Sequence, residues 1–176
     1  MRKLGLTHIY YGDGKGKTTA AIGLAVRARG AGIGVLFAQF LKGRPTAELV
    51  PLEALGAKVC RTPSVQKFIP MMDETELEAC KKDHIACFEA VKSGILSGDQ
   101  GLCVLDEAID AVTMGMLTMD MLQSLISLAK GHGVELVITG HSLPEELAPY
   151  GDYITQMKAC RHPYEQGVAA CEGIEY

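Results

Sequence analysis

A glycine-rich stretch with two lysines and two threonines, residues 12–19 of sequence GDGKGKTT, has the residue types that could bind an anion. Glycines allow consecutive backbone N–H groups to converge on an anion without Cβ atoms in the way. An apolar run, Leu6–Tyr11, precedes the stretch, and a helical pattern of small residues, Ala20–Val26, follows it. Strand, glycine-rich turn and helix in this order are typical of a phosphate-binding loop, in which Lys17 reaches the outer phosphates and the Thr18 hydroxyl binds Mg²⁺.

The loop departs from the usual pattern G-x-x-x-x-G-K-[ST], because Tyr11 stands where the first glycine is expected. It is one residue tighter and holds an extra lysine, Lys15. The alternative is a glycine-rich turn with solvated lysines; the flanking pattern favours the phosphate loop. The residues leave open which nucleotide binds and in which orientation. We predict these nucleotide-binding residues: Gly12, Asp13, Gly14, Lys15, Gly16, Lys17, Thr18, Thr19 and Lys42.

A second candidate functional motif is the run Leu102–Glu107, an apolar strand pattern that ends in two carboxylates, Asp106 and Glu107. Many buried strands end in an acid, so the pattern alone is weak. Downstream of a phosphate loop, an acid at a strand tip is the expected ligand of the nucleotide's Mg²⁺, directly or through water. We therefore predict a magnesium site of Thr18, Asp106 and Glu107, in which either carboxylate is the closer ligand.

Composition is that of a folded protein: the 176 residues are 48% hydrophobic and 22% charged, which fits one domain over residues 1–176. The net charge of −4 argues against a nucleic-acid partner. Basic residues gather in sequence around the phosphate loop instead, which favours a small polyanionic ligand. They are Lys15, Lys17, Arg27, Arg29, Lys42 and Arg44.

The six cysteines form no C-x-x-C pair and have no histidine at metal-ligand spacing, so we expect reduced and mostly buried thiols rather than a metal site. The methionines between Met114 and Met121 are interpreted as helix packing rather than a soft-metal site. No long apolar segment follows Met1-Arg2-Lys3, so no signal peptide is expected, and no run reaches 18 apolar residues. The expected location is the cytoplasm, without a membrane partner.

Buried strands alternate with amphipathic helices, which predicts an α/β protein with a mainly parallel sheet and helices on both faces. Two capping-box patterns, at Asp73–Glu76 and Ser142–Glu145, predict helix starts, and Thr118 is a third cap. His84 lies on the apolar stripe of the helix that begins at Asp73 and is expected to be a core histidine. Strands are expected at 6–11, 34–40, 57–61, 102–107, 134–139 and 153–158, and helices at 20–30, 46–55, 73–96 and 119–130.

Residues 62–72 have no periodicity and contain two prolines, which predicts a loop, yet five of the residues are large and apolar. Loops normally lie on the surface and are polar. The segment is either tucked against the core or a subunit neighbour, or it forms a hydrophobic lid or floor for an apolar ligand. The sequence alone does not separate these two interpretations.

Taken together, these sequence motifs resemble those of the P-loop-type ATP:cob(I)alamin (corrinoid) adenosyltransferases, and the resemblance covers essentially the whole chain. The tight, lysine-bearing loop is itself a mark of that family. The other marks lie at residues 39–43 (QFLKG), 104–107 (VLDE), 138–140 (ITG), 162–163 (HP), 167–168 (GV) and 173–176 (GIEY).

The resemblance implies a RecA-like P-loop NTPase fold, a homodimer, ATP with Mg²⁺, a corrinoid substrate and an electron-donating reductase, in the synthesis of cobalamin cofactors. It implies that the Co(I) centre attacks C5′ of an ATP held in reversed orientation, and that triphosphate leaves. Lys15, Lys17 and Thr18 would stabilise this leaving group. Phe68 and Ile69 would contact the corrinoid and exclude its lower axial ligand.

The chain departs from the family at two positions. Pro70 stands where relatives have tryptophan, and His141 stands where they commonly have arginine after the Thr-Gly pair. We also expect no counterpart of the N-terminal extension that some relatives have. Two other functions remain open from the sequence: a P-loop ATPase or kinase that acts at the γ-phosphate with Glu107 as its base, and a corrinoid or nucleotide carrier without turnover.

Overall fold

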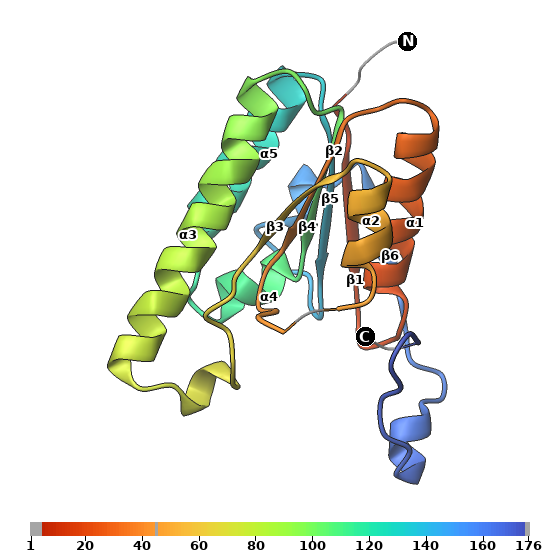
Figure 1. Cartoon of the computed structure of the whole chain (residues 1–176), viewed down its shortest axis with the longest axis vertical. Helices are drawn as coiled ribbons and strands as arrows, with labels where there is room; N and C mark the ends of the chain where they lie inside the picture. The colour runs from red at the N-terminus through yellow and green to blue at the C-terminus, as the bar shows by residue number, and fades with distance from the viewer. Residues whose placement is uncertain (1–4, 45, 175–176) are drawn as a thin grey trace.

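The computed structural model describes residues 5–44 and 46–174, which form one six-stranded sheet with helices on both faces (Figure 1). Every strand pair is parallel and the spatial order is β3-β2-β4-β5-β1-β6. The predicted α/β class, parallel sheet and P-loop NTPase-like fold are confirmed. The strands are β1 (Thr7–Tyr11), β2 (Val35–Gln39), β3 (Lys58–Arg61), β4 (Leu102–Asp106), β5 (Glu135–Gly140) and β6 (Tyr153–Gln156).

The central strands are buried on both faces because each face is covered by a separate layer of helices. Buried alanines of α1 and Leu52 of α2 pack on one face, against side chains such as Phe37 and Val104. The helices α3, α4 and α5 pack on the other face, against the alternate strand residues such as Leu105 and Ile138. The helices are α1 (Lys17–Gly30), α2 (Leu49–Ala54), α3 (Glu74–Leu96), α4 (Ala108–Thr113) and α5 (Met119–Gly131).

The caps at Asp73 and Thr118 form as predicted. The Asp73 carboxylate accepts a hydrogen bond from the Glu76 amide at 2.9 Å, while the Glu76 carboxylate accepts one from the Asp73 amide at 2.8 Å. The Thr118 hydroxyl accepts a bond from the Met121 amide. These contacts satisfy amide groups that have no partner inside the helix.

The helix predicted at Ser142 is wrong. Turns follow His141, and a single turn of 3₁₀ helix, Ala148–Tyr150, is the only regular element described before β6. Pro149 explains the difference, since it lacks the amide hydrogen that an α-helix needs there and its ring clashes with the preceding turn. Leu147 anchors the segment in the core instead.

Histidine 84, three cysteines and most of the methionines pack as predicted. His84, Cys80, Cys87 and Cys103 are fully buried, whereas Cys160 and Cys171 are exposed on the C-terminal segment. Met116 is buried, but Met114 is exposed and lines a cavity. No helix among the described residues is long and apolar enough to cross a membrane.

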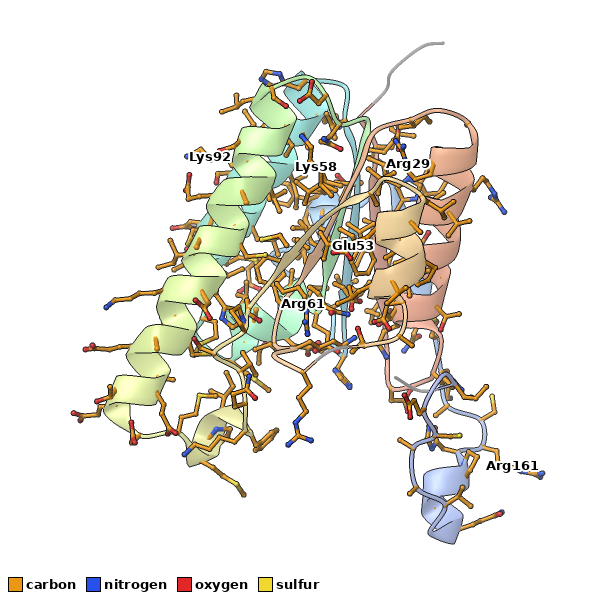
Figure 2. All side chains as sticks on the ribbon, viewed as in Figure 1. Arg29, Glu53, Lys58, Arg61, Lys92 and Arg161 are labelled. Carbon is orange, nitrogen blue, oxygen red and sulfur yellow. The ribbon has the colours of Figure 1, made fainter. Side chains whose placement is uncertain are left out.

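Residues 157–174 project from the body of the protein as a long loop (the tail), which carries a short 3₁₀ helix, Pro163–Gln166, and returns so that Gly173 and Ile174 lie beside Thr18 and Thr19 (Figure 1). Nearly all of its described side chains are exposed, including Val168 and Ile174. Arg161 lies far out on this tail (Figure 2).

Candidate functional site

The phosphate loop connects β1 to α1 at the carboxyl edge of the sheet, and its glycines are required by geometry. Gly12 and Gly16 have φ angles of 120° and 117°, which other residues rarely adopt. A Cβ atom on Gly12 would collide with the carbonyl group of Met157, and one on Gly14 would lie 2.8 Å from the same oxygen. The Gly14 amide donates to that oxygen at 2.8 Å. The chain after β6 therefore braces the loop from outside.

Lysine 17 and Thr18 belong to the first turn of α1 rather than to the loop itself, so both lie at the positive end of the helix dipole. The Lys17 ammonium donates to the carbonyl oxygens of Gly12 and Gly14, at 2.6 and 2.9 Å. Asp13 accepts a hydrogen bond from the Ala159 amide, which lowers the pKa of its carboxyl group. Asp13 thus fastens the tail to the loop.

Aspartate 106 is the centre of the site. It is fully buried at the end of β4, and its Oδ1 atom accepts hydrogen bonds from the hydroxyls of Thr18 and Thr139, both at 2.9 Å. Its Oδ2 atom lies 2.9 Å from the Lys42 ammonium. Three strand ends and the first turn of α1 therefore meet at one carboxylate, as the shared edge of a parallel sheet predicts.

Glutamate 107 follows directly and occupies a left-handed backbone conformation, φ 60°, in which its amide donates to the Thr139 hydroxyl at 2.8 Å. Its carboxylate lies 3.3 Å from the Lys42 ammonium. Burial raises the pKa of Glu107, and Lys42 partly opposes this shift. Burial alone would lower the pKa of Lys42, but the charges of Asp106 and Glu107 outweigh it and raise that pKa.

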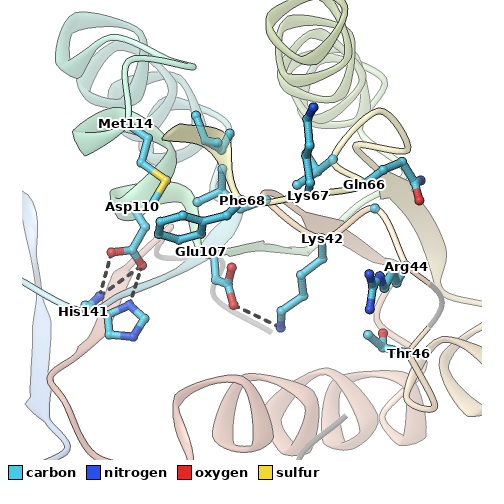
Figure 3. Close-up of a pocket in the computed structure, with 14 residues that line it drawn as sticks. Lys42, Arg44, Thr46, Gln66, Lys67, Phe68, Glu107, Asp110, Met114 and His141 are labelled. Carbon is cyan, nitrogen blue, oxygen red and sulfur yellow. Dashed lines mark hydrogen bonds and ion pairs between the residues drawn. The ribbon is translucent and has the colours of Figure 1, made fainter. Parts of the chain in front are cut away.

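A cavity of about 540 Å³ opens beside these acids (Figure 3). Phe68 and Ile69 from the apolar loop line it, together with Met114 from the end of α4. Phe68 is 62% exposed, although Val65, Ile69 and Met72 of the same loop pack against the core. The base of the loop is therefore tucked against the core, as one of the two interpretations expected, while Phe68 lines the cavity.

His141 and Asp110 form a pair on the side of this cavity that lies away from Arg44 and Thr46 (Figure 3). The Asp110 carboxylate accepts hydrogen bonds from the His141 backbone amide, at 3.1 and 3.2 Å, and its Oδ2 atom lies 3.1 Å from the ring Nδ1. A Cβ atom on Gly140 would lie 2.5 Å from the Cβ atom of Ile109. Only glycine at the end of β5 therefore allows β5 and α4 to lie this close together. The imidazole itself is largely exposed.

The structure brings most of the predicted residues together, but not all of the basic ones. Arg29 lies at the opposite end of α1, where its guanidinium donates to the carbonyls of Leu55 and Ile33 (Figure 2). Arg27 belongs to the same last turn. Their closeness to the phosphate loop in sequence does not bring these arginines to the phosphate site, because 14 helical residues separate the two ends of α1 by about 20 Å.

Three residues of the site were not singled out from the sequence: Thr139 as a partner of Asp106, and Asp110 and Met114 as cavity residues. A signal existed for Asp110. It lies three residues after Glu107, which is one helical turn on, so a helix that begins at Ala108 places both carboxylates on the same side.

A parallel sheet with a glycine-rich loop, a Lys-Thr pair at a helix start and a buried aspartate at a neighbouring strand end defines a phosphate-loop nucleotide-binding protein. Comparison with known families narrows this class to one family. Residues 3–176 match the family model described as ATP:corrinoid adenosyltransferase BtuR/CobO/CobP. The chain belongs to this family.

Curated relatives agree along nearly the full length. The chain is 30% identical over 173 residues to corrinoid adenosyltransferase CobA of Salmonella typhimurium, which covers 98% of this chain and 86% of the relative. It is 27% identical, over the same 98% of its length, to the corrinoid adenosyltransferases of Escherichia coli K12 and Pseudomonas aeruginosa, of which 86% and 84% are covered.

Proposed function

We propose that this protein transfers the 5′-deoxyadenosyl group of ATP to the Co(I) centre of a reduced corrinoid and releases triphosphate. The observation that carries the proposal is the meeting of Thr18, Lys42 and the phosphate loop at Asp106, directly beside an apolar-walled cavity. A nucleotide site and a site for a large apolar ring then share one wall, formed by Lys42 and Glu107.

In the proposed reaction the electron pair of Co(I) attacks C5′ of the ribose, the cobalt–carbon bond forms, and the C5′–O bond breaks. Its electrons leave with the triphosphate. Reduced cobalt is already a strong nucleophile, so the protein need not supply a base; it has to position two substrates and stabilise an anionic leaving group. Reversed binding of ATP would present C5′ rather than the γ-phosphorus to the cavity.

The leaving group would be held by the loop amides, Lys15, Lys17 and Lys42. Lys17 now donates to two loop carbonyls, and phosphate oxygens would replace these acceptors when ATP binds. Lys42 is the cation closest to the acids and can contact both the phosphates and Asp106. Its raised pKa keeps it charged at neutral pH.

The residues present fit a Mg²⁺ ion. Thr18 and Asp106 offer two oxygens 2.9 Å apart beside the phosphate loop, and Glu107 adds a third nearby. Magnesium prefers such oxygen ligands and is usually held by few protein groups, nucleotide phosphates and water. When bound, the ion would neutralise charge that develops on the triphosphate.

The corrinoid would occupy the cavity, with Phe68 and Ile69 against its lower face. An exposed aromatic side chain beside a cavity of this size suits a flat macrocycle. We further propose that the electron comes from a separate reductase and that the chain acts as a homodimer in the cytoplasm. The apolar side chains exposed on the tail are consistent with a subunit contact.

The site is less suited to attack at the γ-phosphorus. A hydrolase or kinase needs a carboxylate that is available to orient water or a hydroxyl, and Glu107 is instead paired with Lys42. A carrier that binds only the corrinoid would not need the network around Asp106 and Thr18.

The proposal is tested by incubating the protein with ATP, Mg²⁺ and chemically reduced cobalamin without oxygen, and by following the light-sensitive cobalt–carbon product. Product is expected for the parent protein, and Lys17→Ala should abolish its formation. Near-normal rates in that variant would refute the assignment of the phosphate site, and binding of both substrates without product would identify a carrier.

A further inference from the structure

His84 is a buried titratable residue that the proposed reaction does not use. It lies on α3, is fully buried, and its ring stacks at 5.9 Å on Phe40, the residue that follows β2. Its Nδ1 atom is 2.7 Å from the Cys80 carbonyl oxygen, and its Nε2 atom is 3.3 Å from the Leu41 amide nitrogen.

These two partners determine the form of the ring. A carbonyl oxygen only accepts and a backbone amide only donates, so Nδ1 must carry the proton and Nε2 must be the acceptor. Protonation would replace the acceptor with a second donor facing the Leu41 amide. Burial lowers the pKa of His84, which keeps the ring neutral; Asp83 on the same helix partly opposes this.

The residue whose amide is hydrogen-bonded to His84 Nε2, Leu41, has an unusual backbone conformation. Leu41 has a φ angle of 56°, a left-handed conformation that leucine rarely adopts and that surrounding contacts must impose. The bend at Leu41 ends the path of β2 and directs the next side chain, Lys42, toward Asp106 and Glu107. On the far side of the bend, Gly43 packs so closely on the Val65 carbonyl that no Cβ atom would fit.

We propose that His84 is a positioning residue for Lys42: its neutral Nε2 atom holds the Leu41 amide and thereby fixes the bend that brings the Lys42 ammonium to the two carboxylates. The inference rests on the proposed function, in which Lys42 contacts the triphosphate. It assigns to a buried helix residue a specific effect on nucleotide binding and turnover.

Two amide substitutions separate this role from simple packing. His84→Gln places an amide oxygen near the position of Nε2, where it can accept from Leu41. His84→Asn has a shorter side chain that can still donate to the Cys80 carbonyl but does not reach Leu41. We expect His84→Asn to raise the Kd for Mg-ATP about tenfold and to lower the rate of adenosyl transfer about tenfold. His84→Gln should stay within about threefold of the parent in both.

A double-mutant cycle with Lys42→Met then tests the route of the effect. If His84 acts through Lys42, His84→Asn should cause little further loss of Mg-ATP affinity in the Lys42→Met background. Val91→Ala, a fully buried change on the same helix, is the matched control. It should lower stability and leave the ATP affinity of the parent unchanged.

The form of the ring provides a readout that packing does not affect. In the ¹⁵N NMR spectrum of histidine-labelled protein, His84 should show the neutral tautomer protonated at Nδ1. The inference is overturned by the other tautomer, by equal losses in His84→Asn and His84→Gln, or by an undiminished loss in the Lys42→Met background. ATP affinity is measured without corrinoid, so these outcomes stay distinct from failure of adenosyl transfer itself.

Discussion

Asp106 is the residue on which the geometry of the site depends most. Its two oxygens are shared among the hydroxyls of Thr18 and Thr139 and the ammonium of Lys42, with no exposure to solvent. A buried carboxylate is tolerated only when hydrogen bonds and an opposite charge compensate its lost hydration. The network therefore explains both how Asp106 is stable there and why a cation stands next to an expected metal site.

Removal of that cation should destabilise the fold. We expect Lys42→Met to lower the free energy of unfolding by about 2 kcal/mol, since it leaves a buried carboxylate without its counter-charge. Urea denaturation measures the change. Lys67→Met is the control, because Lys67 forms an exposed pair with Glu76 that should contribute roughly 1 kcal/mol or less. Equal losses in the two variants would contradict the role given to Lys42.

The titration of His84 should appear in the pH dependence of stability. Its folded pKa lies below its ordinary value of 6.5, so below pH 6.5 the unfolded chain binds a proton that the folded chain does not. The contribution of His84 to the free energy of unfolding is therefore fully present above pH 6.5 and is lost as the pH falls through the folded pKa. The raised pKa of Glu107 acts oppositely: its contribution is lost as the pH rises from 4.5 through the folded pKa.

We therefore expect His84→Gln to flatten the decrease in unfolding free energy below pH 6.5, measured by urea denaturation at a series of pH values. A parent-like decrease in His84→Gln would show that another group is responsible.

Residue types and spacing were sufficient to predict the phosphate loop and the acids of β4. They were not sufficient for the contacts between Lys42, Thr139 and Asp106, which lie 33 or more residues apart in sequence. Those contacts depend on the order of strands in the sheet, and that order results from long-range packing.

At the scale of elements, the two capping-box patterns had different outcomes for a physical reason. The pattern at Asp73 precedes 23 residues of uninterrupted helix, whereas the one at Ser142 precedes Pro149. A cap stabilises a helix only when the following residues can continue it.

This difference gives a paired prediction. Asp73→Ala should lower the free energy of unfolding by about 1 kcal/mol, because the Glu76 amide loses its acceptor. Ser142→Ala should change it by less than about 0.5 kcal/mol, as expected for a surface substitution. Thermal or urea unfolding of both variants provides the comparison, and a larger effect at Ser142 would contradict the structural account.

The loop of residues 62–72 should show a functional effect that is separate from stability. Phe68→Ala is expected to change unfolding free energy little, since the ring is mostly exposed. It should reduce adenosylation that starts from Co(II) more than adenosylation that starts from Co(I), because the ring is proposed to exclude the lower axial ligand.

Met71→Ala is the matched control for Phe68→Ala. Met71 is also exposed on this loop but does not line the cavity. Its activity should equal that of the parent from either cobalt state. Equal losses from Co(II) and Co(I) in Phe68→Ala would count against the proposed exclusion.

At the scale of the molecule, the function follows from one edge of one sheet. The ends of β1, β2, β4 and β5 lie side by side there, so the phosphate loop, Lys42, the two acids and His141 become neighbours (Figure 1). The alternation of strands and helices predicted the parallel sheet that forms this edge. It did not predict that α4 would carry Asp110 and Met114 to the cavity rim, because α4 is only six residues long and has little periodicity.

The central claim is that ATP is attacked at the ribose carbon and not at phosphorus. The most direct test is ³¹P NMR of the products after reaction of ATP and Mg²⁺ with reduced cobalamin in the absence of oxygen. We predict one intact triphosphate for each cobalt–carbon bond formed. Orthophosphate released in proportion to the ATP consumed, with no cobalt–carbon product, would contradict the claim and identify a phosphate-directed enzyme.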